Sequence, residues 1–337
     1  MGPVKNILLI RFDRIGDLIL TLPTDQIDFF KDKKVHWLIS KTNEFIIHNA
    51  KPRRDYLAIV APKTFSDFRQ LVKNIKSHNF DATVLFHAPW WLFFAVWSAR
   101  IPMRIGPLSQ WYSIFFLNRA IRQRRSQSLQ SELKYNLCLL EHAFNLPPQN
   151  SNLLYLSIEA PQMKSDLPVC YAIIHAGMKG SARNWPQANY VDLAIKMKDD
   201  IAVVFTGTKE DEQWLKPIKE QLRDQHNIIF IDGLLNSEQL LSVLNKAQFV
   251  VAPSTGIAHL AASLGRPTYC LFSPVKVQSP TRWKPHGPKV SVFVPEVSCP
   301  GHFHCLLDKC EYFDCMKMID PQQVFVLLKP LCGSKGV

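Results

Sequence analysis

The sequence predicts an α/β protein of two doubly wound domains, each with a parallel sheet covered by helices on both faces. Short apolar runs alternate with helical patterns through both halves of the chain, which is typical of repeated strand–helix–strand units. With 337 residues and 47% hydrophobic content, the chain is too long for one ordinary core and apolar enough for two. A polar, proline-containing stretch at 158–168 separates the halves. We therefore expect domains at 1–160 and 169–320, followed by a closing helix and tail at 321–337.

The first half is expected to alternate strands and helices. Short apolar runs predict strands, and longer stretches with an apolar stripe predict helices. The expected strands lie near residues 7–11, 35–39, 57–61 and 82–86, and the expected helices near 18–30, 65–77 and 133–144. A further apolar segment at 88–99 spans about a dozen residues, too few to cross a membrane, so it should be buried or touch a membrane surface.

The second half repeats the pattern. The expected strands lie near residues 171–175, 202–206, 228–231, 249–252, 268–272 and 290–294, and the expected helices near 188–198, 211–222, 237–245, 257–264 and 321–331. In open parallel sheets, ligands collect at the carboxyl ends of the strands, so the loops after these strands are the first place to look for a site.

The charge of the chain indicates acidic partners. Its net charge is +12, its first apolar run is interrupted by Arg11 and Asp13 too early for a signal peptide, and residues 82–131 contain no Asp or Glu. We expect a cytoplasmic protein whose basic, aromatic segment suits a phosphate-bearing amphiphile. A solubilising basic face over an ordinary core is the alternative. Nucleic acid is disfavoured because the aromatic residues form blocks in apparent core elements and no recognised binding module is present.

Four of the eight cysteines form a cluster near the end of the chain. They are Cys299, Cys305, Cys310 and Cys315, with His302 and His304 between them. Their spacing lacks the C-x2-C pairs of common zinc sites. Zinc binding, disulfide pairing and simple packing of the loop all remain open, and no metal or cofactor is predicted for the chemistry.

The first loop with potential chemistry follows the opening strand and ends at Gly16-Asp17. Gly16 permits a tight backbone, and a carboxylate at Asp17 is stabilised at the start of the next helix. Asp17 is then either an N-cap or a general base that faces a substrate hydroxyl.

Two further loops indicate an anion site. Pro253-Ser254-Thr255-Gly256 leads into the helix that carries His259, where free backbone N–H groups and the helix dipole favour a diphosphate. Ser254 or Thr255 as a plain N-cap is the competing interpretation, and His259 is either a ligand contact or a satisfied core histidine. The loop after residue 175 carries Gly177, Gly180 and Arg183, whose planar guanidinium suits phosphate. A solvated loop charge is the alternative for Arg183.

These segments together resemble glycosyltransferase family 9, the ADP-heptose:lipopolysaccharide heptosyltransferases. The matching residues are 16–23, 181–186 and 254–267, and the tail at 315–321 is similar to the family's carboxyl-terminal pattern. The resemblance implies a GT-B architecture, in which two Rossmann-like domains face each other across a cleft. It also implies that the first domain binds mainly the acceptor, that the second binds mainly a nucleotide sugar, and that transfer inverts the anomeric carbon without a metal.

The resemblance also implies roles for individual residues. Asp17 matches the family's proposed base, and Arg183 matches a residue that binds the donor phosphates and stabilises the departing diphosphate. The donor contacts expected on this basis are Gly177, Met178, Ser181, Arg183, Glu210 (with Asp211 as the alternative), Leu235, Ser254, Thr255, Gly256 and His259. The acceptor contacts expected are Arg14, Gly16, Arg53, Arg54 and Arg122. Ser254 departs from the family, because well-known heptosyltransferases have an aspartate there that contacts the sugar.

The predicted function is transfer of a sugar, with heptose from ADP-heptose favoured, to an anionic glycolipid of the lipopolysaccharide-core type. We expect a monomer in the cytoplasm with peripheral contact at the inner membrane. One alternative is a family relative that uses another nucleotide sugar or a protein acceptor. A second, of a different class, is a non-catalytic nucleotide-binding protein, because doubly wound folds also serve binding alone.

Overall fold

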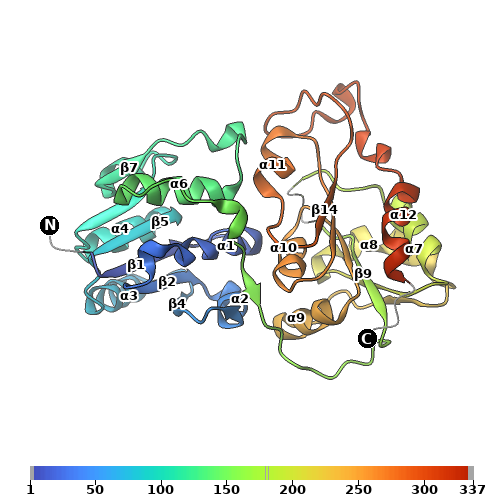
Figure 1. The fold of residues 1–337 in the computed structure, drawn as a ribbon, viewed down its shortest axis with the longest axis horizontal. Helices are drawn as coiled ribbons and strands as arrows, with labels where there is room; N and C mark the ends of the chain where they lie inside the picture. Colours follow the sequence, from blue (N-terminus) through green and yellow to red (C-terminus); the bar gives the residue numbers. More distant parts are fainter. Residues whose placement is uncertain (1–3, 179, 181, 333–337) are drawn as a thin grey trace. The chain divides into compact units, whose positions relative to one another are not determined.

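The computed structural model describes residues 4–178, 180 and 182–332. The chain divides into two compact units, the first formed by Met1–Arg125 with Gln130–Ile158 and the second by Ser126–Leu129 with Glu159–Val337. Over the described residues, each unit is built on its own six-stranded parallel sheet with helices on both faces (Figure 1). The predicted α/β class of two doubly wound folds is therefore confirmed.

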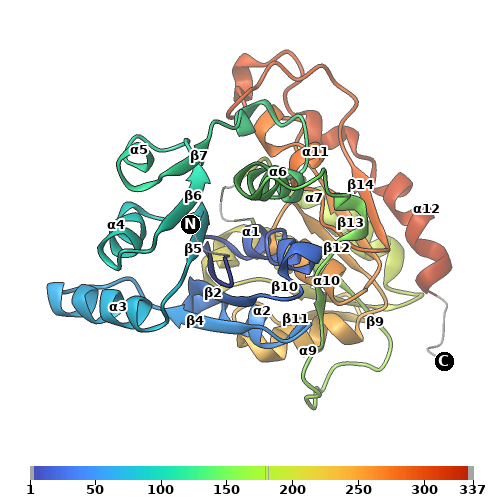
Figure 2. The same cartoon turned by 60° about the vertical axis from the view of Figure 1, so that its left-hand side comes forward.

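The sheet of the first unit has the order β4-β2-β1-β5-β6-β7. Its strands are β1 (Asn6–Arg11), β2 (Lys34–Ser40), β4 (Asp55–Ile59), β5 (Ala82–His87), β6 (Met103–Pro107) and β7 (Arg119–Ile121). Its helices are α1 (Ile15–Ile19), α2 (Glu44–His48), α3 (Phe65–Ser77), α4 (Trp90–Ser98), α5 (Ser113–Phe116) and α6 (Glu132–Phe144). Figure 2 shows α3, α4 and α5 in a row on one face of this sheet, with α1 and α6 on the other.

Three features of the first unit differ from the sequence prediction. The helix expected at 18–30 ends after one turn and a half at Ile19 and gives way to short 3₁₀ segments, Leu22–Gln26 and Asp28–Phe30. Pro23 explains this end, because a proline lacks the N–H that continues an α-helix and its ring clashes with the preceding turn. Strands β6 and β7 were not predicted, since they are short and lie within the aromatic, basic segment. A two-stranded antiparallel pair, β3 (Ala50–Lys51) with β8 (Ser157–Ile158), was also missed.

The sheet of the second unit has the order β11-β10-β9-β12-β13-β14. Its strands are β9 (Tyr171–His175), β10 (Ala202–Thr206), β11 (Ile228–Phe230), β12 (Val250–Pro253), β13 (Thr268–Leu271) and β14 (Val290–Phe293). Its helices are α7 (Gln187–Met197), α8 (Glu212–Leu222), α9 (Ser237–Lys246), α10 (Gly256–Ser263), α11 (Pro280–Trp283) and α12 (Pro321–Cys332). Each predicted strand and helix of this unit is present within two residues of its expected ends.

The closing helix α12 packs against α7 and completes the core of the second unit. Val324 and Leu328 of α12 are fully buried with Trp185 in one apolar cluster. The indole N–H of Trp185 donates a hydrogen bond of 2.9 Å to the carbonyl of Ile319, just before the helix. Since a buried Trp N–H needs a partner, this bond fixes where the start of α12 docks.

The order of the strands predicts where a ligand site should lie in each unit. Strand β1 lies between β2 and β5, and β9 lies between β10 and β12. At such points the chain leaves the sheet in opposite directions on the two sides, which opens a crevice at the carboxyl ends of the strands. The loops after β1, β9 and β12, which carry the residues singled out from the sequence, begin at these points of the two sheets. Among the described residues, no helix is both long and apolar enough to cross a membrane.

Candidate functional site

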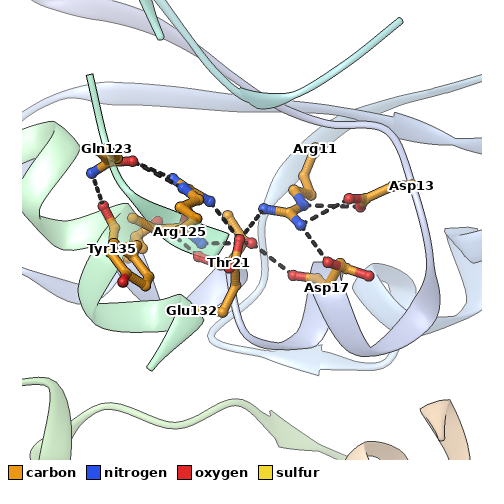
Figure 3. Close-up of polar contacts among 10 residues, drawn as sticks. Arg11, Asp13, Asp17, Thr21, Gln123, Arg125, Glu132 and Tyr135 are labelled. Carbon is orange, nitrogen blue, oxygen red and sulfur yellow. Dashed lines mark hydrogen bonds and ion pairs between the residues drawn. The ribbon is translucent and has the colours of Figure 1, made fainter. Parts of the chain in front are cut away.

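A buried ionic network surrounds Asp17 in the first unit (Figure 3). Arg11, the last residue of β1, is only 2% exposed and its guanidinium contacts three carboxylates. The distances are 2.8 Å to Asp13, 2.5 Å to Asp17 and 3.0 Å to Glu132. A buried arginine is tolerated only when its charge is paired, so these carboxylates are what allows Arg11 to lie inside the unit.

The network continues through Glu132, the first residue of α6, to the loop before that helix. Glu132 is 1% exposed and also contacts Arg125 at 2.5 Å, and Arg125 in turn is held by the side chain of Gln123 at 2.9 Å. Burial raises the pKa of Asp13 to about 7; Arg11 opposes this rise and the nearby Asp17 adds to it. The first loop therefore holds a carboxyl group that titrates near neutrality beside the candidate base.

Asp17 is the third residue of α1, and the interpretation of Asp17 as an N-cap is wrong. The N-cap position belongs to Arg14, whose extended backbone precedes the helix, and no side chain makes a capping hydrogen bond there. The Asp17 carboxylate instead binds Arg11 and keeps 16% of its surface exposed. A carboxylate that is held by a buried cation yet remains partly accessible has the arrangement that a positioned general base needs.

The predicted acceptor residues have different surroundings. Arg14 is exposed and Gly16 is buried, both in the turn that carries Asp17, while Arg53 and Arg122 are exposed on other loops. Arg54 corrects the prediction: its side chain is 3% exposed and clamps Asp25 with two bonds of 2.6 and 2.8 Å. Because its charge is already paired inside the unit, we assign Arg54 a structural role.

In the second unit, a cavity of about 290 Å³ opens at the carboxyl ends of the strands. Leu235, predicted to contact a base, lines this cavity, as does Ile257 in the first turn of α10. The remaining lining residues are His175, Thr206, Gly207, Thr208, Lys209, Ile231, Gly233 and Leu240. An apolar wall with a few polar groups is typical of a small-ligand pocket. Most of these residues were missed, since only folding brings the ends of β9, β10 and β11 together.

The two candidates for a ribose contact differ in burial: Asp211 is buried and Glu210 is exposed. Asp211 is 6% exposed, and its carboxylate accepts hydrogen bonds from the N–H and hydroxyl of Thr208 at 2.8 and 2.7 Å. Glu210 is exposed beside the cavity residue Lys209. Asp211 therefore shapes the loop, and Glu210 stays the candidate for ligand contact.

The start of α10 has buried polar atoms that the fold does not satisfy. Thr255 occupies the N-cap position, as the competing interpretation has it, but its side chain makes no capping hydrogen bond. Among the described residues, neither Thr255 Oγ1 nor His259 Nδ1 has a hydrogen-bond partner, although both atoms are buried. Burial, and to a lesser extent His286, lowers the pKa of His259 to about 3, so its ring is neutral at physiological pH. Buried polar atoms without partners at the N-terminus of a helix are typical of a site that binds an anion or a sugar.

Arg183 lies next to the cysteine cluster instead of lining the 290 Å³ cavity. Its guanidinium pairs with Asp314 at 2.9 Å and stacks over the ring of Phe313 at 5.1 Å. Among the described residues, its buried Nε has no hydrogen-bond partner, so part of its donor capacity is unused. The interpretation of Arg183 as a solvated loop charge is wrong. Its partner Asp314 could not be predicted from the local sequence, because the two residues lie far apart along the chain.

Of the other predicted residues on this loop, Met178 is half-buried, and Ser181 lies outside the described residues.

The four clustered cysteines line one small cavity together with Arg183 and Asp314. None of these four cysteines forms a disulfide, and within the described parts of the chain no His, Cys, Asp or Glu side chains are grouped as ligands for a metal ion. Burial raises the pKa of Cys315 to about 11, and the neighbouring thiols add to the rise. In this structure the four side chains pack around one cavity beside Arg183, so the cluster supports the loop that holds Arg183.

Comparison with known proteins decides the family. Residues 68–310 match the model of glycosyltransferase family 9 (heptosyltransferase). The chain belongs to glycosyltransferase family 9. A Haemophilus influenzae protein that carries the name glycosyltransferase is 26% identical over 303 residues, which span 84% of this chain and 86% of the relative. The enzyme is therefore a glycosyltransferase.

Solved structures agree on the fold of this family 9 enzyme. A family 9 glycosyltransferase from Veillonella parvula has a TM-score of 0.77 at 17% identity and covers 97% of both chains. The E. coli ADP-heptose lipopolysaccharide heptosyltransferase II has a TM-score of 0.76 at 18% identity and covers 97% of this chain and 98% of its own. The two parallel-sheet units thus form the GT-B architecture that the sequence resemblance implied.

Replacing Gly177 with alanine is expected to destabilise the second unit by about 1–3 kcal/mol. The new Cβ would lie 2.5 Å from Cγ of Asp211 and 2.6 Å from both of its oxygens, and Asp211 is fixed by Thr208. The melting temperature of Gly177→Ala should fall. In an Asp211→Ala background the same substitution should add little, and an equal additional loss there would show that the contact with Asp211 is not the cause.

Stability of the second unit is expected to fall as the pH drops from about 6.5 toward 4. Burial lowers the pKa of His175 to about 4, against a partial opposing effect of Asp211. As the pH falls, the unfolded chain therefore binds a proton at this histidine before the folded chain does. The stability that the neutral histidine contributes is complete above pH 6.5 and is lost between pH 6.5 and 4, by about 3 kcal/mol. Melting temperature against pH measures it. His175→Gln should flatten the acid limb, whereas His226→Gln, at an exposed position, should leave it unchanged; equal curves for wild type and His175→Gln would contradict the assignment.

Proposed function

We propose that this enzyme transfers a heptose from ADP-heptose to a lipopolysaccharide-core-type acceptor, with inversion of the anomeric carbon and without a metal ion. The observation that carries the proposal is the start of α10, where Thr255 Oγ1 and His259 Nδ1 are buried without partners among the described residues. Beside it lies the 290 Å³ cavity lined by Leu235, a volume near the lower end of those that hold small ligands. The E. coli heptosyltransferase II named above, and a Salmonella typhimurium relative named lipopolysaccharide heptosyltransferase 1 that is 29% identical over 109 residues, support the substrate class.

In the proposed reaction, Asp17 accepts the proton of an acceptor hydroxyl as its oxygen attacks the anomeric carbon. The new C–O bond forms while the bond between that carbon and the donor diphosphate breaks, and ADP leaves with the bonding electrons. The N-terminus of α10 and Arg183 stabilise the charge that develops on the diphosphate. One terminal nitrogen of Arg183 pairs with Asp314, and its Nε–H has no partner among the described residues and is proposed to donate to the diphosphate.

The binding roles are divided between the two halves of the chain. Residues 1–160 bind the anionic glycolipid acceptor through Arg14, Gly16, Arg53 and Arg122, and residues 169–320 bind the nucleotide sugar. Within the donor site, Glu210 holds the ribose, Leu235 contacts the base, and Gly177, Met178, Ser181, Ser254 and Gly256 complete the contacts. The enzyme acts as a cytoplasmic monomer in peripheral contact with the inner membrane.

Ser254 favours a second candidate within the same class. A serine replaces the aspartate that contacts the sugar in well-known heptosyltransferases, and its hydroxyl is a weaker acceptor for sugar hydroxyl groups than a carboxylate. The second candidate is therefore transfer of a different sugar from another nucleotide donor, with the same base and phosphate site.

Thermal shift with nucleotide sugars tests the donor. At 100 times its dissociation constant, a cognate ligand stabilises by about 2.7 kcal/mol, or about 5 °C for a unit of this size. ADP-heptose should give this shift, and UDP-glucose and GDP-mannose should not.

A pair of variants tests whether the shift arises at the start of α10. Thr255→Val should abolish the shift, whereas Thr42→Val, at an exposed threonine of the first unit, should preserve it. A larger shift with UDP or GDP sugars would overturn the donor, and loss of transfer activity in EDTA would overturn the metal-free reaction.

A further inference from the structure

An exposed aromatic surface lies on the first unit. Five large apolar side chains point outward from α4 and the α5 segment, and we call them the aromatic surface. They are Trp90 (59% exposed), Trp97 (48%), Trp111 (81%), Ile114 (67%) and Phe115 (68%). Side chains of this size are rarely exposed together on a monomer, and a patch of them marks an interaction site.

The surface is continuous from one helix to the next. The ring of Trp97 on α4 lies 6.2 Å from that of Phe116 on α5, which joins the two helices, and the ring of Trp111 lies 6.4 Å from that of Phe115. Figure 2 shows α5, α4 and α3 side by side on one face of the sheet, and α4 packs against both neighbours. The outward rings therefore belong to one face and are not scattered over the unit.

The core of the unit does not require these outward residues. Helix α4 buries Leu92, Phe93, Ala95 and Val96 against the sheet, which satisfies its inner side. Trp90 and Trp97 are seven residues apart and so lie on the same outer stripe of the helix. The sequence presented this apolar segment as buried or touching a membrane surface; in the structure its inner side is core and its outer side is exposed.

The charges around the surface favour an anionic partner. Residues 82–131 contain no acidic side chain, and exposed cations flank the rings, with Arg100 at the end of α4 and Arg69, Lys73 and Lys76 on α3. The acidic residue of α3, Asp67, is engaged in its own capping box with Thr64. Exposed tryptophan and phenylalanine with surrounding Lys and Arg are the composition of segments that lie in the interface of an anionic bilayer. A second copy of the chain would bring two basic faces together.

Helix α4, which carries part of the aromatic surface, also contacts the loop that leads to Asp17. Trp91, next to Trp90, packs edge-on against Phe12 at 5.3 Å, and Phe12 stands between Arg11 and Asp13 of the ionic network. Helix α4 therefore supports the loop that leads to Asp17, and a partner that binds the outer side of α4 would contact the helix that supports this loop.

We propose that the aromatic surface docks this unit on an anionic lipid bilayer, with its rings in the interface and the flanking cations on the lipid phosphates. This deepens the proposed function, on which it rests for the identity of a lipid-linked acceptor. Docking through α4 and α5 brings the unit that carries Asp17 to the membrane in which such an acceptor is anchored.

Vesicle flotation of the full chain tests the proposal. Wild type should bind vesicles of phosphatidylglycerol with phosphatidylethanolamine, and bind phosphatidylcholine vesicles at least about tenfold more weakly. Trp111→Ser with Phe115→Ser should weaken binding to the anionic vesicles by about tenfold or more, as should Lys73→Glu with Lys76→Glu. Leu153→Ser, an equally exposed apolar residue of the same unit (75% exposed), should bind as wild type does. Raised salt should weaken wild-type binding.

Transfer to a delipidated, water-soluble acceptor separates this proposal from the proposed function. The Trp111→Ser, Phe115→Ser variant should transfer sugar to that acceptor at the wild-type rate, because neither residue lies in the site. If wild type transfers no sugar to this acceptor, the proposed function is overturned. Vesicle binding is measured without any transfer reaction, so its result does not depend on that outcome. Equal vesicle binding by the aromatic variant and wild type would overturn the docking surface. So would a wild-type dimer that the same variant converts to a monomer, which would assign the surface to a second copy of the chain.

Discussion

Asp17→Asn is expected to lower kcat by about a thousandfold, with the fold intact and KM for the donor nearly unchanged. The amide has the size of the carboxylate but does not accept the hydroxyl proton, so only the step that deprotonates the acceptor is lost. Arg11 keeps its contacts with Asp13 and Glu132 at 2.8 and 3.0 Å, so the network survives. Steady-state transfer kinetics, with the melting temperature as a check on folding, measure the effect.

Asp13→Asn is the matched control for this prediction. It removes a carboxylate that contacts the same guanidinium, and the pKa of Asp13, raised to about 7 by burial, means that the wild-type group is already partly protonated at neutral pH. The variant should keep kcat within about tenfold of wild type. The reverse result, with Asp13→Asn inactive and Asp17→Asn active, would transfer the base role to Asp13.

Arg11→Met is expected to destabilise the first unit by about 3–5 kcal/mol. The substitution leaves Asp13, Asp17 and Glu132 as a group of like charges with one remaining arginine, Arg125, in contact with Glu132. Removing one partner from a buried ionic network costs far more than removing a surface charge, because the remaining charges stay desolvated. Urea unfolding of the first unit should show the loss as a lower midpoint.

Two variants make the Arg11 result specific. Lys31→Met removes an ion pair whose side chains are 75% and 89% exposed, and should cost less than about 1 kcal/mol. Adding Glu132→Gln to Arg11→Met should recover part of the stability, since it removes one of the unpaired carboxylates. Equal losses in Arg11→Met and Lys31→Met would show that the network does not stabilise the unit.

Local sequence patterns were enough for the second sheet. Strands β9 and β10 have the predicted ends, Tyr171–His175 and Ala202–Thr206, because a fully apolar run between turn residues has few alternatives to a buried strand. The same logic failed for β7, Arg119–Ile121, where three residues in a basic segment have no detectable period. At 18–30 the apolar residues suggested a longer helix than Pro23 allows.

The sequence by itself determined the fold class and the loops that carry the candidate residues, since both depend on neighbours along the chain. Tertiary structure alone decided the partners of those residues: Arg11 with Glu132, Arg54 with Asp25, and Arg183 with Asp314. In the cavity of the second unit, it likewise brought His175 together with Leu235. The physical reason is that a buried charge or cavity wall takes whichever partner packing brings within contact distance, however far apart the two lie in the sequence. Periodicity reports only which face of a strand or helix is buried.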